Sequence, residues 1–238
     1  MDRKRRRPGV IDSLMRCVTI WDMSGRIVVI VCGLLYGVLN GTAVAAPKSE
    51  SLATAWRLDV KFHDPQRVTL RFPGDQHPST FWYMLYQVTN NTGQEVGFYP
   101  SFRLVTDTLQ VVVGGADIPP SVYDAITARH KGEFPFLAPP ARVTGRLLQG
   151  EENARASVAV FRPFDREANS FTVYASGFSG EIQRSPNPAF DTKQKESESN
   201  PRSFILRRTL AIIYALPGAP EKRWWAKPVR RTREWVMR

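Results

Sequence analysis

The strongest constraint on the fold of this chain is the strict alternation of apolar and polar residues along two neighbouring stretches. Residues 56–62 read WRLDVKF, and after a break at HDPQ the alternation resumes over residues 67–72. Because successive side chains of a strand point to opposite faces of a sheet, this period of two predicts two strands, each with one apolar and one charged face. We expect them to form an antiparallel hairpin with one side on a core and the other in water.

A third stretch is apolar on both of its faces. Residues 81–88 read FWYMLYQV, which predicts a central strand that is buried on two sides. The residues NNTG follow at 90–93 and predict a turn, since Asn and Gly tolerate the positive φ of tight turns. The chain is then expected to return through residues 96–105, where Pro100 marks a bulge or a sheet edge.

One helix is expected, between Asp117 and Gly132. Asp117 is a candidate N-cap, Pro119 and Pro120 suit the first helical turn, and Gly132 suits the end. The other patterns favour strands, about nine in all. The chain is therefore predicted to be mainly β, an antiparallel Ig-like β-sandwich with one short helix. The further strands are predicted at residues 109–113, 142–148, 156–161, 171–176 and 204–216.

The first 45 residues have the composition of an export signal. A basic cluster at residues 2–7 precedes an uncharged run of thirteen residues at 27–39, which is the length of a signal h-region. Ala43, Val44 and Ala45 then give the small-any-small pattern at which signal peptidase cuts. We therefore expect cleavage after Ala45 and a periplasmic or extracellular location.

Two alternatives to this cleaved signal peptide stay open. Residues 27–46 are about as long as a bilayer span, so the first is an uncleaved transmembrane helix in a membrane-anchored envelope protein. The second is a start of translation at Met23, which would give a more compact signal peptide. Lipidation at Cys32 is disfavoured, because Val31 stands before it where a small residue is needed.

The cysteines and the charge set the expected mature domain, residues 46–218, apart from the two ends. Both Cys17 and Cys32 precede the expected cleavage point, so the domain has neither a disulfide nor a thiol nucleophile. Of the net charge of +11, residues 1–45 carry +4 and residues 219–238 carry +5, which leaves +2 for the rest. A nearly neutral domain argues against nucleic acid as a partner.

Candidate groups for catalysis or metal binding are sparse. Asp75 and His77 share a loop, but two ligands are fewer than the three or four of a zinc site. GFSGE at 177–181 lacks the G-x-S-x-G spacing of a hydrolase nucleophile, so we expect a turn there. Glu151 and Glu152 read as solvated loop charges, with calcium binding as the alternative. We predict no catalytic residue, no cofactor and no metal site; the alternative is a hydrolase or carbohydrate-acting enzyme whose site assembles only in the fold.

Two segments near the C-terminal end lack a strand pattern. Residues 183–202 hold three prolines, many charges and a single aromatic, which predicts a mobile loop. Residues 219–238 form a basic tail with seven cations and three tryptophans. It suits an anionic surface, since each cation near an anionic membrane contributes about 1 kcal/mol and Trp favours the interface. Alternatively, Trp224 and Trp225 pack on the domain. The candidate contact residues are Arg223, Trp224, Trp225, Lys227, Arg230, Arg231, Arg233 and Trp235.

Several stretches carry a likeness to known sequences: WRLDVKFHDPQRVTL, FWYMLYQVTNNTG, FYPSFRLVTDT, IPPSVYDAI and GRLLQGEENARASVAVF. Over residues 56–216 the chain resembles an uncharacterised family of exported β-rich proteins associated with planctomycete-type bacteria. The resemblance implies export and a single domain, and it implies no activity. We therefore expect a non-catalytic interaction module whose tail contacts an envelope protein, an anionic polymer or a membrane surface.

Overall fold

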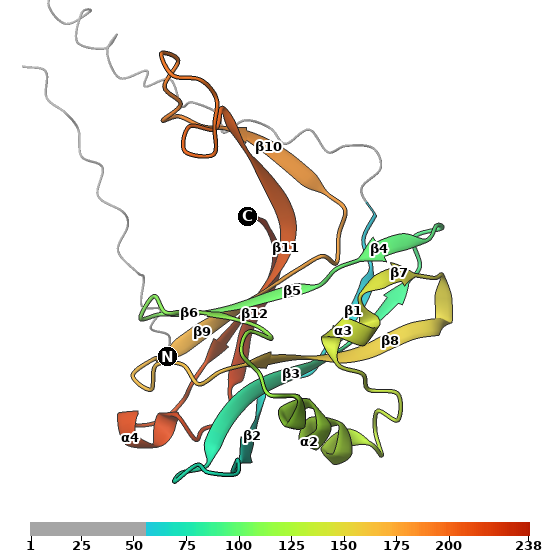
Figure 1. The fold of residues 1–238 in the computed structure, drawn as a ribbon, viewed down its shortest axis with the longest axis vertical. Coiled ribbons are helices and arrows are strands. Elements are labelled where there is room, and N and C mark those ends of the chain that lie inside the picture. The colour runs from blue at the N-terminus through green and yellow to red at the C-terminus, as the bar shows by residue number, and fades with distance from the viewer. Residues whose placement is uncertain (1–55) are drawn as a thin grey trace, which may run out of the picture. The chain divides into compact units, whose positions relative to one another are not determined.

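The computed structural model describes residues 56–238 (Figure 1). The predicted signal segment, its alternative as an anchor and the alternative start at Met23 all lie outside the described residues. Within residues 56–238, no helix combines the length and the apolar character that a membrane span requires.

The smaller of the two main sheets is built on a central strand, as predicted for residues 81–88. Strand β3 (Ser79–Asn90) pairs along one edge with β8 (Gly150–Phe161). Its other edge pairs with both β1 (Asp59–Phe62) and β2 (Gln66–Leu70), which follow one another along successive halves of β3. The predicted hairpin between residues 56–62 and 67–72 is therefore wrong. The short break at residues 63–65 does not reverse the chain, and the twelve residues of β3 are long enough to pair with both strands.

The larger sheet has six strands, and every pairing in it is antiparallel. Its longest strand, β11, pairs with β9 along one edge and with β12 along the other, while β10 pairs with the first residues of β11. Figure 1 shows β11 strongly curved. The six strands are β5 (Ser101–Thr106), β6 (Val111–Val113), β9 (Ser170–Ser176), β10 (Ile182–Pro186), β11 (Ser203–Ala215) and β12 (Val229–Met237).

Pro100 divides the predicted return strand at residues 96–105 into two strands of different sheets. The first, β4 (Val96–Phe98), forms a two-stranded sheet with β7 (Gly145–Leu147), and the second, β5, belongs to the larger sheet. Proline has no main-chain N–H for a sheet ladder, so a change of partner at this residue leaves no N–H donor unpaired.

Two apolar clusters cover the two faces of β3. On one face, Trp82, Met84, Tyr86 and Val88 share a cluster with residues of the larger sheet, and the Tyr86 ring lies 5.1 Å from the Phe102 ring. On the opposite face, Phe81, Tyr83 and Leu85 share a second cluster with residues of the main helix. The alternating side chains of β3 are thus buried on both faces, as the sequence predicts.

The main helix, α2 (Pro120–His130), lies where the sequence predicts it, but its start differs. Pro119 is the N-cap residue, and no side chain caps the helix. Asp117 instead has a φ of 52° and belongs to the preceding turn, so its predicted capping role is wrong. Two four-residue helices, α3 (Pro140–Val143) and α4 (Pro220–Arg223), were not predicted. Residues 56–238 are mainly antiparallel β, as predicted, with twelve strands and three helices in place of about nine and one.

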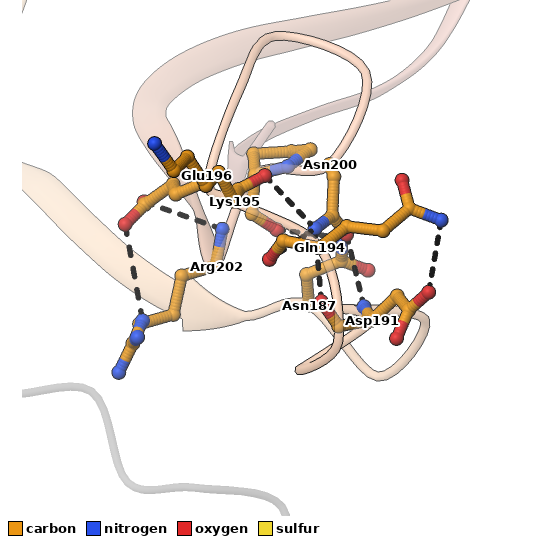
Figure 2. A network of polar contacts seen from close by, with 8 residues as sticks. Asn187, Asp191, Gln194, Lys195, Glu196, Asn200 and Arg202 are labelled. Atoms are coloured by element: carbon orange, nitrogen blue, oxygen red, sulfur yellow. Dashed lines mark hydrogen bonds and ion pairs between the residues drawn. The ribbon is translucent and has the colours of Figure 1, made fainter.

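Polar side chains organise the segment that was predicted as a mobile loop. Residues 182–186 form β10, and the loop after it is closed by hydrogen bonds of Asn187, Asp191 and Asn200 (Figure 2). The Asn187 amide donates to the Pro201 carbonyl at 2.7 Å. The side chain of Asn200 accepts from the Asp191 N–H at 2.9 Å and donates to the Asp191 carbonyl at 3.0 Å. Side-chain hydrogen bonds to the main chain thus replace the apolar contacts that this sequence lacks.

Candidate functional site

Part of the basic segment at residues 219–238 belongs to the larger sheet. Its first part contains α4, and residues 229–237 form β12, which pairs with β11 over eight pairs of residues. A bulge between Ile213 and Tyr214 changes the register. Main-chain hydrogen bonds to β11 hold this strand in place, although five of its first six side chains are charged or polar.

The three tryptophans of this segment have different environments. Trp224 is only 4% exposed, and its ring lies 5.5 Å from Trp82 and 5.0 Å from Phe164. Trp235 is partly buried against the core, with the Arg208 guanidinium 5.6 Å from its ring. Trp225 is 58% exposed. Trp224 therefore packs on the domain, whereas the ring of Trp225 is exposed and accessible to another molecule.

Several arginines of the segment bind within the molecule. Arg230 donates to Asp64 from Nε at 3.0 Å and from a terminal nitrogen at 2.5 Å. Arg233 donates to the Val60 carbonyl at 3.1 Å and lies over the Phe62 ring. These contacts join β12 of the larger sheet to β1 and the turn after it. Arg223 donates to the Glu167 carbonyl at 3.4 Å, whereas Lys227 and Arg231 are exposed and make no ion pair among residues 56–238.

A polar cleft of about 620 Å³ lies between the turn after β1 and the segment before β12. We call it the C-terminal cleft. Two segments more than 150 residues apart in sequence build it, and Pro65 and Pro228 restrict the backbone on either side. Its lining residues are His63, Asp64, Pro65, Gln66, Arg67, Lys227 and Pro228.

Arg67 fixes the exposed tryptophan at this cleft. Its guanidinium donates to the main-chain carbonyls of Trp224 and Trp225. The same group lies 4.9 Å from the Trp82 ring and 5.6 Å from the Trp225 ring, so it is placed between a buried and an exposed aromatic. Partial burial lowers the pKa of Arg67, although a guanidinium keeps its charge at any physiological pH.

The charge of the cleft is positive in excess. Lys227 and Arg67 line it, and the one carboxylate in the lining, Asp64, is already paired with Arg230. Behind this pair lies Tyr214, whose pKa is raised to about 12, chiefly by burial. Its hydroxyl therefore stays neutral, and it adds no negative charge to the site.

A second polar cluster supports the cleft from the side of α2. The Tyr83 hydroxyl donates to Gln66 Oε1 at 3.0 Å and lies 2.9 Å from His130 Nε2. Burial lowers the pKa of His130. His63 packs edge-on against Phe134, with 5.0 Å between ring centroids. These contacts position Gln66 and His63 in the wall of the cleft.

The groups considered for catalysis are not brought together. Asp75 and His77 are exposed just before β3 begins, whereas Glu152 lies on β8 next to Gly150, which pairs with the last residue of β3. Because β3 spans eleven residue steps at about 3.3 Å each, roughly 36 Å separate its ends. Residues 56–238 contain no group of three or more His, Cys, Asp or Glu that could hold a metal ion.

The sequence GFSGE forms the turn expected for it. The Ser179 hydroxyl accepts from the Glu181 N–H at 3.2 Å within the turn and donates to the Trp56 carbonyl at 3.1 Å, which ties the turn to the segment before β1.

The C-terminal cleft contains an exposed cation, Lys227, and the exposed ring of Trp225 lies 5.6 Å from Arg67 in its wall. This arrangement can bind an anionic group, and it offers no paired acid and base. Lys227 and Arg230 were predicted as contact residues from the basic composition of their segment, whereas Arg67 and Gln66 were not predicted to belong to the site. Comparison of the chain with models of protein families, with curated proteins and with solved structures found no match.

Proposed function

We propose that this chain is an exported, non-catalytic interaction module that binds an anionic polymer at the C-terminal cleft. The observation that carries the proposal is the exposed Lys227 in a cleft whose described lining has more cations than carboxylates, with the exposed Trp225 ring 5.6 Å from Arg67 in the wall of that cleft. A polymer with repeated negative groups can form an ion pair with Lys227 while its apolar parts pack against the ring of Trp225. The expected signal segment at residues 1–45 is the support for export.

The same proposal includes a β-sandwich as the scaffold. Residues of both main sheets share one core cluster, and Trp82 of β3 lies 6.0 Å from Phe171 of β9. Two sheets with one common apolar layer are typical of sandwiches. The Ig-like strand order stays a prediction.

The state of the polar groups favours binding over turnover. Asp64 accepts two hydrogen bonds from Arg230 at its Oδ1, so this carboxylate oxygen is already engaged within the molecule. His63 packs against an aromatic ring at the edge of the cleft. These groups serve to hold the shape and charge of the cleft.

The test is binding of labelled dextran sulfate by the full chain, measured by fluorescence anisotropy at several salt concentrations. Lys227→Glu reverses the exposed charge and should weaken binding about tenfold and flatten the salt dependence, since each cation near an anionic surface contributes about 1 kcal/mol. Trp225→Ala should weaken it severalfold. Lys195→Glu, an equal charge reversal in the loop before β11, is the matched control and should bind like the wild type.

Two results would contradict the proposal. One is that neutral dextran competes as well as dextran sulfate. The other is that Lys227→Glu, with an unchanged circular dichroism spectrum, retains wild-type affinity.

Export has its own test, which is the N-terminal sequence of the protein isolated from its host. A mature start at Ala46 supports the cleaved signal. Retention of residues 27–46 in a membrane fraction would replace it with the membrane-anchored alternative, and an intact N-terminus in the cytoplasm would contradict export altogether.

A further inference from the structure

The face of the larger sheet that points away from the core carries arginines. On β5, Phe102 and Leu104 are buried while Ser101 and Arg103 are exposed. The same alternation on the neighbouring strands directs a further set of polar side chains to this face. These are Tyr174 and Ser176 on β9, and Arg207 and Thr209 on β11.

These side chains surround a hollow of about 200 Å³, which we call the arginine hollow. Ser101 pairs with Ser176 in the ladder between β5 and β9, and Arg103 pairs with Tyr174. Arg238 joins from the end of β12, where its N–H and carbonyl bond to the main chain of Arg207. Its guanidinium carbon lies 3.9 Å from the centre of the Tyr174 ring.

The hollow is strongly cationic. Its described lining contains Arg103, Arg207 and Arg238, and within residues 56–238 no Asp or Glu side chain lines it. Among residues 56–238, none of these three arginines forms an ion pair. Like charges gathered on one face repel each other, so an anion that enters the hollow relieves this repulsion as well as gaining direct hydrogen bonds.

We propose that the arginine hollow binds a tetrahedral oxyanion, the phosphate or sulfate group of a monoester. A guanidinium presents its N–H groups in a planar fork that matches two oxygens of such a group, and three forks suit its several oxygens. The Ser176 and Thr209 hydroxyls donate to main-chain carbonyls, so the arginines are the main donors for the anion. The hollow has a volume of about 200 Å³, which leaves room for one such group with part of its carrier.

The rigidity of the floor supports this assignment. Strand β9 lies between β5 and β11 and is hydrogen-bonded on both edges. The side chains that form the floor are therefore held by the central part of a sheet, which is a more precise support than a loop. The site is separate from the C-terminal cleft, and it shares no lining residue with it.

The experiment is isothermal titration calorimetry of the full chain with inorganic phosphate and with glycerol 3-phosphate. Wild type should bind at least one of them with a dissociation constant below about 10 mM. Arg103→Gln/Arg207→Gln should weaken binding by about tenfold or more, because each lost fork removes a charge-assisted contact. Arg103→Lys keeps the charge but loses the fork, so its affinity should fall between the two.

The two ligands distinguish the source of the group. Equal affinities support a site for the free ion, and tighter binding of glycerol 3-phosphate supports a group carried on a larger molecule. Arg184→Gln, an exposed arginine on β10 outside the hollow, is the matched control. Lys227→Glu should leave phosphate binding unchanged, which separates this site from the cleft. The inference is overturned if neither ligand binds, or if the double variant binds like wild type.

Discussion

The two adjacent tryptophans at residues 224 and 225 allow one residue type to be tested in two environments. Trp224→Ala removes a ring that is 4% exposed and contacts Trp82 and Phe164. A buried Trp hides about 200 Å² of surface, which at about 25 cal/mol per Å² is about 5 kcal/mol. Core Trp→Ala changes cost about 3–5 kcal/mol, so we expect a loss of about 4 kcal/mol.

Trp225→Ala is the matched comparison. Its ring is 58% exposed, and its main specific contact is with the Arg67 guanidinium at 5.6 Å. The loss should be about 1 kcal/mol, from partial burial and one cation–π contact.

Urea unfolding of the full chain, followed by circular dichroism, measures both free energies from the midpoint and the slope. On heating, Trp224→Ala should lower the melting temperature by roughly 8–16 °C and Trp225→Ala by about 2–4 °C. Equal losses in the two variants would refute the burial of Trp224 and, with it, the docking of the segment that leads into β12. A near-zero loss in Trp224→Ala would do the same.

Two further predictions concern a turn and a titrating side chain. Gly177→Ala should lower the free energy of unfolding in urea by more than 1 kcal/mol, because Gly177 has a φ of +88° and an added Cβ would lie 2.3 Å from the Tyr99 carbonyl oxygen. Gly132→Ala is the control and should be tolerated, because an added Cβ there would meet no atom within 4 Å. Burial lowers the pKa of His130 in the fold, because it disfavours the charged ring. The neutral ring therefore contributes its full stability above about pH 6.5, and this contribution is lost as the pH falls through the folded-state pKa. The free energy of unfolding should therefore fall more between pH 7 and pH 5 in wild type than in His130→Asn, and parallel curves would show that the ring does not titrate against the fold.

The basic C-terminal segment has a structural role that its composition conceals. Arg230 and Arg233 connect β12 to Asp64 and to the Val60 carbonyl, and Arg67 binds back to the carbonyls of the two adjacent tryptophans. Charged side chains at this edge thus join two sheets. Only a few members of the segment, with Lys227 and Trp225 foremost, are left to contact another molecule.

The local pattern of the sequence determined where most of the strands lie and which of their faces are apolar. The all-apolar run in β3 predicted a strand buried on both faces, and the alternation in β1, β2 and β9 predicted their positions to within a few residues. These properties depend on the two-residue period of a strand, which any short window of sequence displays. The helix α2 was similarly evident from its flanking Pro and Gly residues.

Only the tertiary structure decided the partners of these elements. The two-residue period of a strand shows which of its faces is apolar, but it does not show which strand pairs with it. For this reason β1 and β2 were expected to pair with each other, whereas both pair with β3. Strand β12 was missed because main-chain bonds to β11, not its own side chains, define it. The C-terminal cleft also depends on the tertiary structure, because its lining residues Arg67 and Lys227 are far apart in sequence and are brought together only by the fold. Adjacent tryptophans of identical chemistry were separated into core and surface for the same reason: burial depends on what the rest of the chain packs against each of them.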